Sequence, residues 1–141
     1  MLGVVPTPSF VSDAVAARLR LFLDRMRGES ADYGADAEGL IDSAADTLVG
    51  GKRLRARFCH AGWQAVARFG DRDAEESAAL WDVCAALEIF QSAALVHDDL
   101  IDNSDTRRGR PAAHRALESA HVGAGWRLSL IHISEPTRRT P

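Results

Sequence analysis

Apolar residues recur every three or four positions along most of the chain, which is the period of an amphipathic helix. The first expected helix covers residues 12–27 and is expected to lie on the surface. A glycine-bounded linker, residues 28–34, ends this helix. Its apolar stripe consists of Val15, Leu19, Leu21, Leu23 and Met26.

Two more helices are expected on either side of a glycine pair. The second covers residues 37–48, and Gly50-Gly51 separates it from the third, which covers residues 53–69. The third has the pattern of a core helix, because its apolar residues repeat at helical spacing. These residues are Leu54, Phe58, Ala61, Ala65 and Phe69.

The fourth expected helix, residues 73–97, is the longest, and Asp73 can cap its free amides. Turn-forming residues then occupy positions 103–111, and a short helix is expected over residues 112–121. Strands are not expected, because β-branched and aromatic residues do not alternate with polar ones. The pattern therefore predicts an all-α fold, and so long a helix suits a large helical barrel or bundle. The apolar face of the fourth helix consists of Leu80, Val83, Cys84, Leu87, Phe90 and Ala94.

Composition limits which binding partners and which cellular compartment are expected. The 141 residues fit one domain, and a net charge of -3 gives no reason to expect nucleic acid or an anionic membrane as partner. Cys59 and Cys84 form no CxxC pair, so we expect neither a zinc site nor a disulfide framework, and a cytoplasmic location is the simpler one. We also expect no export signal and no stretch that approaches the ~20 apolar residues of a membrane span.

The end of the chain differs from the rest. The segment LSLIHISEPTR, which begins at Leu128, resembles the translation of a transposon-type sequencing-library adapter. We therefore expect residues 1–127 to be the native part and residues 128–141 to be a non-native tail. The alternative is a short strand with a basic tail, but no other segment offers it a partner strand.

Three aspartates mark the end of the fourth expected helix. Asp98 and Asp102 are spaced i, i+4, so they lie one turn apart on the same helix face, where like charges repel. A bound cation would relieve that repulsion. Carboxylate oxygens without nearby Cys or His ligands suit Mg²⁺, which also binds substrate phosphate oxygens. The alternative is a solvated acidic helix end; a calcium loop would need a glycine and a distal Glu that are missing here.

Two basic motifs flank the aspartates. The first, GGKRLR at residues 50–55, places two flexible glycines and three cations at a helix start, where free amides also favour an anion. It lacks the spacing and hydroxyl residue of a nucleotide-binding P-loop. The second, TRRGRP at residues 106–111, supplies guanidinium groups that pair bidentately with phosphate. The alternatives are a solvated helix start and a basic loop that neutralises the neighbouring aspartates.

The order and spacing of GGKRLR, Gln91, DDLID and TRRGRP resemble those of the trans-polyprenyl diphosphate synthase family, which includes farnesyl and geranylgeranyl diphosphate synthases. The resemblance covers roughly residues 45–114, and Ala56 stands where the family often has proline. It implies the isoprenoid synthase fold, a helical barrel or bundle with the active site between helices. It also implies Mg²⁺ as cofactor and isopentenyl diphosphate plus an allylic diphosphate as substrates.

The resemblance also implies roles for individual residues. Asp98 and Asp102 would ligate magnesium ions that bridge the allylic diphosphate, with Asp99 in support. Arg107 would hold the same diphosphate, whereas Arg53 is expected to be solvated. In the family reaction the allylic carbon–oxygen bond ionises, the isopentenyl double bond attacks the carbocation, and a proton is lost. The positions that bind isopentenyl diphosphate in the family are occupied here by Lys52, Arg55, Gln91 and Arg108.

Product length follows less directly from the resemblance. In the family, the residues five and four positions ahead of the first aspartate line the floor of the product pocket, and here they are Ala93 and Ala94. Small side chains leave depth for a geranylgeranyl or longer product. The alternative is that both alanines are simply good helix formers.

Family members are longer and carry a second aspartate-rich motif that this sequence lacks. The resemblance therefore implies an N-terminal fragment that is inactive alone, exposes apolar faces, and forms homodimers when full length. A terpenoid cyclase or related condensing enzyme is a rival, but it would leave Lys52, Arg55 and Arg108 unexplained. A regulatory subunit would not need the metal ligands, and a helical interaction module would leave all three motifs to coincidence.

Overall fold

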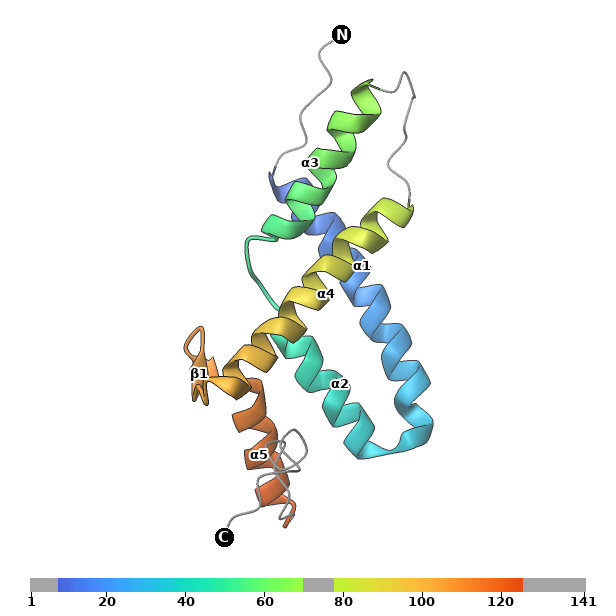
Figure 1. Ribbon diagram of the computed structural model, residues 1–141. Coiled ribbons are helices and arrows are strands. Elements are labelled where there is room, and N and C mark those ends of the chain that lie inside the picture. Colours follow the sequence, from blue (N-terminus) through green and yellow to red (C-terminus); the bar gives the residue numbers. More distant parts are fainter. Residues whose placement is uncertain (1–7, 70–77, 126–141) are drawn as a thin grey trace.

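The fold is almost entirely helical, which confirms the all-α prediction (Figure 1). A computed structural model describes residues 8–69 and 78–125, so the proposed cap at Asp73 and the tail from residue 126 lie outside the described residues. Most expected boundaries agree with the structure to within a few residues. The elements are α1 (Pro8–Ser30), the 3-10 turn η1 (Ala31–Tyr33), α2 (Ala35–Thr47), α3 (Leu54–Phe69), α4 (Ala78–Ile101), β1 (Thr106–Arg107), β2 (Arg110–Pro111) and α5 (Ala113–Gly123).

Helix α1 is part of the core, so the expectation of a surface helix was wrong. It packs against α3 and α4, which Figure 1 shows crossing it, and its residues Val11, Val15 and Leu19 are buried. Leu21, which the sequence placed on or near the same stripe, is 60% exposed. The first helix therefore contributes to the hydrophobic cluster that holds α3 and α4 together.

Replacing Leu19 by alanine is expected to lower the free energy of unfolding of this chain by about 2–5 kcal/mol, because the side chain is buried and leaves a cavity. Leu21→Ala is the matched control on the same helix, and its effect should stay within about 0.5 kcal/mol. Urea denaturation followed by circular dichroism measures both. Equal effects of the two substitutions would contradict the assigned core face of α1.

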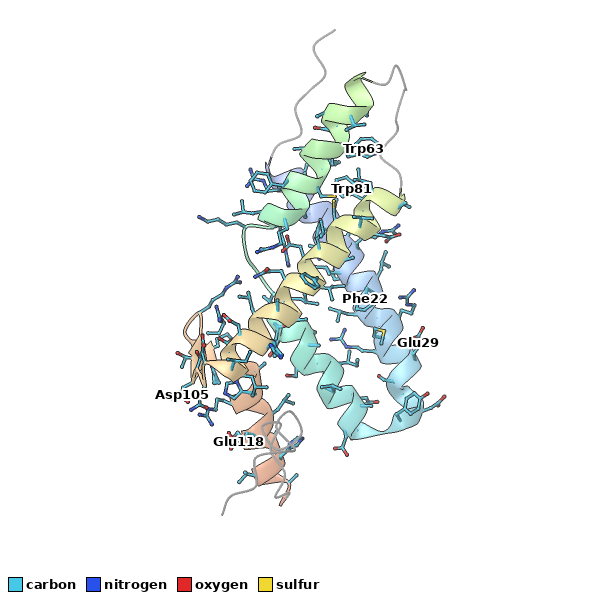
Figure 2. All side chains as sticks on the ribbon, in the orientation of Figure 1. Phe22, Glu29, Trp63, Trp81, Asp105 and Glu118 are labelled. Carbon is cyan, nitrogen blue, oxygen red and sulfur yellow. The ribbon has the colours of Figure 1, made fainter. Side chains whose placement is uncertain are left out.

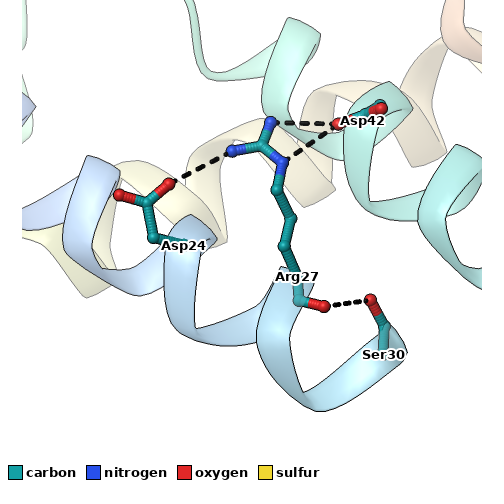
Figure 3. A network of polar contacts seen from close by, with 4 residues as sticks. All are labelled: Asp24, Arg27, Ser30 and Asp42. Carbon is teal, nitrogen blue, oxygen red and sulfur yellow. Dashed lines mark hydrogen bonds and ion pairs between the residues drawn. The ribbon is translucent and has the colours of Figure 1, made fainter. Parts of the chain in front are cut away.

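The turn between α1 and α2 begins later than expected. Helix α1 continues through Gly28 to Ser30, whose hydroxyl donates to the carbonyl of Arg27 at 3.1 Å (Figure 3). The Arg27 guanidinium bridges to α2 by donating to Asp42 at 3.0 and 3.1 Å, and it also contacts Asp24 (Figure 3). These groups are largely exposed, so the network orients the helix pair more than it stabilises it.

Helix α3 buries a different face from the one that the sequence predicted. Phe58 on the expected stripe is 74% exposed, whereas Ala56 and His60 are buried. The His60 ring lies 6.4 Å from the Trp63 ring and stacks on that of Trp81 at 5.1 Å, in the region that Figure 2 labels between α3 and α4. Both faces of α3 carry apolar residues, so burial depends on which face meets α1 and α4. The prediction used the wrong face.

The packing of α3 on α4 also buries the Cys84 thiol and determines its protonation. Cys59 and Cys84 are free thiols, and the Cys84 thiol contacts the carbonyl of Ala56 at 3.5 Å. Burial, with a smaller contribution from Cys59, raises the pKa of Cys84 to about 12. Cys84 is therefore a neutral core side chain at physiological pH.

Helix α4 leaves apolar side chains exposed, as do parts of α3. This matches the expectation of exposed apolar faces. Helix α4 is also long and apolar enough to cross a membrane by length and composition, so the expectation that no stretch has this character was wrong. A core helix passes the same test, and arginines from α1 and from the α2–α3 loop pair with the α4 carboxylates Asp82 and Glu88. The large exposed side chains on the two helices include Phe58, Val66, Val83, Phe90 and Ile101.

Candidate active site

The acidic motif begins in the last turn of α4 and ends at Asp102, the residue directly after the helix, and Asp98 and Asp102 are both exposed. The Asp102 amide donates to the Asp98 carbonyl at 2.9 Å, so the two side chains lie one turn apart as predicted. Neither carboxylate forms an ion pair with any residue in the described ranges. Negative charge at a helix C-terminus is unfavourable because the carbonyl ends already carry partial negative charge. The arrangement therefore favours an added cation.

Asp99 lies on another face of α4 and is buried, with 3% of its surface exposed. Its carboxylate accepts hydrogen bonds from Arg107 Nε at 3.0 and 2.9 Å, and from Arg107 Nη2. This contact with Asp99 raises the pKa of Arg107, so the guanidinium stays charged. Asp99 thus holds the Arg107 guanidinium against α4, and its carboxylate oxygens are already occupied by this contact.

The second basic motif forms a β-hairpin, whereas the sequence predicted only turn-forming residues there and no strands. Strands β1 and β2 pair with Arg107 opposite Arg110, and Arg108-Gly109 form the two-residue connection. Both connecting residues have positive φ, 53° and 76°, which fits a type I′ turn. The hairpin therefore directs neighbouring arginines to different places: Arg107 contacts α4, while Arg108 lies at the tip.

The tip of the hairpin meets the first basic motif. Gly50 and Gly51 have φ of 73° and 89°, a conformation that side chains rarely adopt. A Cβ atom at Gly51 would lie 3.5 and 3.6 Å from the two terminal nitrogens of Arg108. The glycines thus shape the loop, and Arg108 packs directly over it.

One cleft between these two loops and α4 contains all four residues that the resemblance assigned to isopentenyl diphosphate. Its volume is about 550 Å³, and Glu88, Ser92 and Leu95 of α4 also line it. The three cations among the four form no ion pair with the described part of the chain. Unpaired cations around one cleft are suited to binding a polyanion such as a diphosphate. The four residues are Lys52, Arg55, Gln91 and Arg108.

Arg53 is not solvated, so that expectation was wrong. Its side chain is 11% exposed, lies 3.6 Å from the equally buried Glu88 carboxylate, and donates to the carbonyl of Leu48. The sequence analysis gave no role to Glu88. Its place three residues ahead of Gln91, as the one charged residue in the sequence from Val83 to Val96, was the signal that could have identified it.

The exposed carboxylates fit Mg²⁺ better than a metal that needs a complete protein cage. Within residues 8–69 and 78–125, three or more Asp, Glu, His or Cys side chains nowhere converge into a metal site. Mg²⁺ typically takes one or two carboxylates and completes its shell with water and substrate phosphate oxygens. Asp98 and Asp102 supply that number of carboxylates next to the cationic cleft.

The two alanines of the product-length prediction lie on different faces of α4. Ala94 is exposed one turn before Asp98, on the face that carries it. Ala93 lines an apolar groove of about 510 Å³ between α1, α2, α4 and α5, together with Phe22, Leu40 and Leu117. A chain that extends from Asp98 along α4 would therefore meet Ala94 before Ala93.

Two curated proteins of similar sequence are prenyl diphosphate synthases or their subunits. Heptaprenyl diphosphate synthase component 2 of Geobacillus stearothermophilus is 39% identical over 103 residues, which cover 73% of this chain and 28% of that protein. The chloroplastic heterodimeric geranylgeranyl pyrophosphate synthase large subunit 1 of Arabidopsis thaliana is 41% identical over 81 residues, which cover 55% and 20%.

A solved structure is similar as well. The geranylgeranyl pyrophosphate synthase of Corynebacterium glutamicum, complexed with isoprenyl diphosphate and magnesium, superposes with a TM-score of 0.71 and 35% identity. The superposition covers 89% of this chain and 34% of that one. The chain thus spans between one fifth and about one third of the length of these relatives. A profile of the polyprenyl synthetase family matches residues 38–130, which include every motif of the candidate site, and the chain therefore belongs to the polyprenyl synthetase family.

Proposed function

We propose that the protein is a magnesium-dependent trans-prenyltransferase that condenses isopentenyl diphosphate with an allylic diphosphate, and that this chain supplies the N-terminal part of its catalytic domain. The supporting observation is the convergence on one cleft, beside the aspartate-rich end of α4, of Gln91 and three cations that form no ion pair among the described residues. Relatives named as geranylgeranyl and heptaprenyl diphosphate synthases support the same reaction.

The cations of the cleft and the two exposed aspartates have different roles in this reaction. Lys52, Arg55 and Arg108 bind the diphosphate of the isopentenyl substrate and orient its double bond. Asp98 and Asp102 would hold Mg²⁺, which neutralises the charge on the departing allylic diphosphate. The allylic carbon–oxygen bond breaks with both electrons on oxygen, the double bond attacks the cation, and loss of a proton restores an alkene. Positioning and charge neutralisation account for the chemistry without a covalent nucleophile.

The test is to recover the complete gene by amplifying outward from the region that encodes residues 50–114. We expect an open frame that encodes more helix and a second aspartate-rich motif. The purified product, given isopentenyl and allylic diphosphates with magnesium, should release a longer prenyl diphosphate. A folded full-length protein that binds both substrates but makes no product would overturn the catalytic assignment and favour a regulatory subunit.

We further propose a product of geranylgeranyl size or longer, supported by the small side chain of Ala94 one turn below Asp98. Ala94→Phe should shorten the main product by at least one five-carbon unit, because a ring there blocks a chain growing along α4. Chromatography of dephosphorylated products measures the change. Ala86→Phe, on an exposed position of α4 two further turns toward the N-terminus, is the control and should still release a geranylgeranyl product. An unchanged product in Ala94→Phe would contradict this pocket.

The assembly is also a proposal, and we favour a homodimer. The names of two relatives, "component 2" and "large subunit", point instead to a different partner subunit in those proteins. Light scattering of the purified full-length protein distinguishes these cases. A lone monomer that gains activity only with a second gene product would favour the heteromeric arrangement.

A further inference from the structure

In the described part of the chain, Glu88 is the only carboxylate of α4 that contacts the first basic motif. Its side chain is 11% exposed, and one oxygen lies 3.6 Å from Arg53 Nη1. The other oxygen accepts the backbone N–H of Ala56 at 3.2 Å. Ala56 is the third residue of α3, so this amide is one of the helix-start donors without an intrahelical acceptor. Glu88 therefore caps α3 from a position 32 residues away in the chain.

Arg53 connects this contact to the preceding helix. It has φ of +48°, an uncommon conformation for a residue with a side chain. Its guanidinium donates to the carbonyl of Leu48, just after α2, and faces Glu88 on α4. Its own carbonyl accepts the Arg57 amide at 3.0 Å, which starts α3. Arg53 thus joins the end of α2, the start of α3 and the middle of α4.

The other two cations of the first basic motif each lie next to a residue that Glu88 contacts. Lys52 directly precedes Arg53, and Arg55 directly precedes Ala56. When Glu88 fixes the Arg53 side chain and the Ala56 amide, it limits the directions in which Lys52 and Arg55 can leave the backbone. Both then line the same cleft as Gln91, which lies three residues after Glu88 on α4.

We propose that Glu88, acting through Arg53, is a positioning residue that presents Lys52 and Arg55 to the diphosphate of the isopentenyl substrate. This inference rests on the proposed function of the cleft. It explains why an acidic side chain lines a site for an anion. A free carboxylate there would repel diphosphate, but pairing with Arg53 neutralises it and uses its oxygens to hold the loop.

Glu88→Gln gives a result whose sign decides between two roles. If Glu88 acted only through its charge, removing that charge from an anion site would lower the KM for isopentenyl diphosphate. Positioning predicts the opposite: the KM should rise on the order of tenfold, since small displacements of binding groups are costly. The KM for the allylic substrate should stay within about twofold. Arg53→Met should give the same rise, and the double variant should be no worse than Arg53→Met alone.

The assay uses the full-length protein and includes a control variant in which a different ion pair of α4 is broken. Arg18→Met breaks the 2.9 Å pair between α1 and Asp82 of α4, away from the cleft, and should leave both KM values unchanged. Circular dichroism verifies that each variant is folded. An unchanged or lowered KM for isopentenyl diphosphate in Glu88→Gln, or additive effects in the double variant, would overturn the positioning role.

Calorimetric titration with isopentenyl diphosphate separates this inference from the proposed function. If the unmodified protein binds isopentenyl diphosphate but makes no product, the catalytic assignment fails. The positioning role is then tested by comparing the dissociation constants of Glu88→Gln and the unmodified protein for isopentenyl diphosphate. Tighter or equal binding by Glu88→Gln then refutes positioning, whereas about tenfold weaker binding supports it. If the unmodified protein does not bind isopentenyl diphosphate, both inferences fail.

Discussion

Replacing Asp98 and Asp102 together by asparagine is expected to lower kcat of the full-length protein on the order of 1,000-fold or more. The two carboxylates are exposed, unpaired with the described residues and one turn apart, so they are the groups through which the proposed Mg²⁺ would reach the leaving diphosphate. Loss of several kcal/mol of charge stabilisation in the transition state corresponds to a rate loss of about this size. Steady-state kinetics at saturating substrates and magnesium measures it.

The same double substitution should slightly stabilise the folded protein. It removes two repelling charges from a helix C-terminus, which is worth a few tenths of a kcal/mol. Asp105→Asn is the matched control, because Asp105 is an exposed aspartate that pairs with Arg115 outside the proposed metal site. Its kcat should stay within about threefold of the unmodified value. A double variant that keeps its activity would show that Asp98 and Asp102 are only a solvated acidic helix end.

Replacing Arg108 by asparagine should raise the KM for isopentenyl diphosphate about 10- to 100-fold. The lost charge-assisted hydrogen bonds are worth about 1.5–3 kcal/mol, and each 1.4 kcal/mol corresponds to about a tenfold change. Asparagine is chosen because Arg108 has φ of 53° at the hairpin tip, and Asn-Gly is a favoured pair for this turn. The hairpin should therefore persist while the charge is lost.

Arg110 provides the control within the same hairpin. It lies in β2, opposite Arg107, and pairs with Asp46 of α2 at 3.1 Å on the exposed surface. Arg110→Asn should change the KM for isopentenyl diphosphate by about twofold or less, because exposed ion pairs contribute little. Equal effects at Arg108 and Arg110 would indicate a general electrostatic role of the basic loop and would contradict a specific contact from its tip.

Local sequence determined the helices and the chemistry that they carry. Helical periodicity, glycine pairs and turn residues act over a few positions, so the expected helices of the described part agree closely with α1 to α5. The spacing of Asp98 and Asp102 also followed from helix geometry alone. The family resemblance named the four residues of the cleft, and the structure brings them together.

Tertiary packing decided what local sequence could not. Both faces of α3 are apolar, so only contact with α1 and α4 determined that Ala56 and His60 are buried while Phe58 is exposed. Whether Arg53 is solvated depends on Glu88, which lies far along the chain. Charges interact according to distance in space, and only the folded arrangement shows that Arg53 is neutralised while Lys52, Arg55 and Arg108 remain unpaired among the described residues.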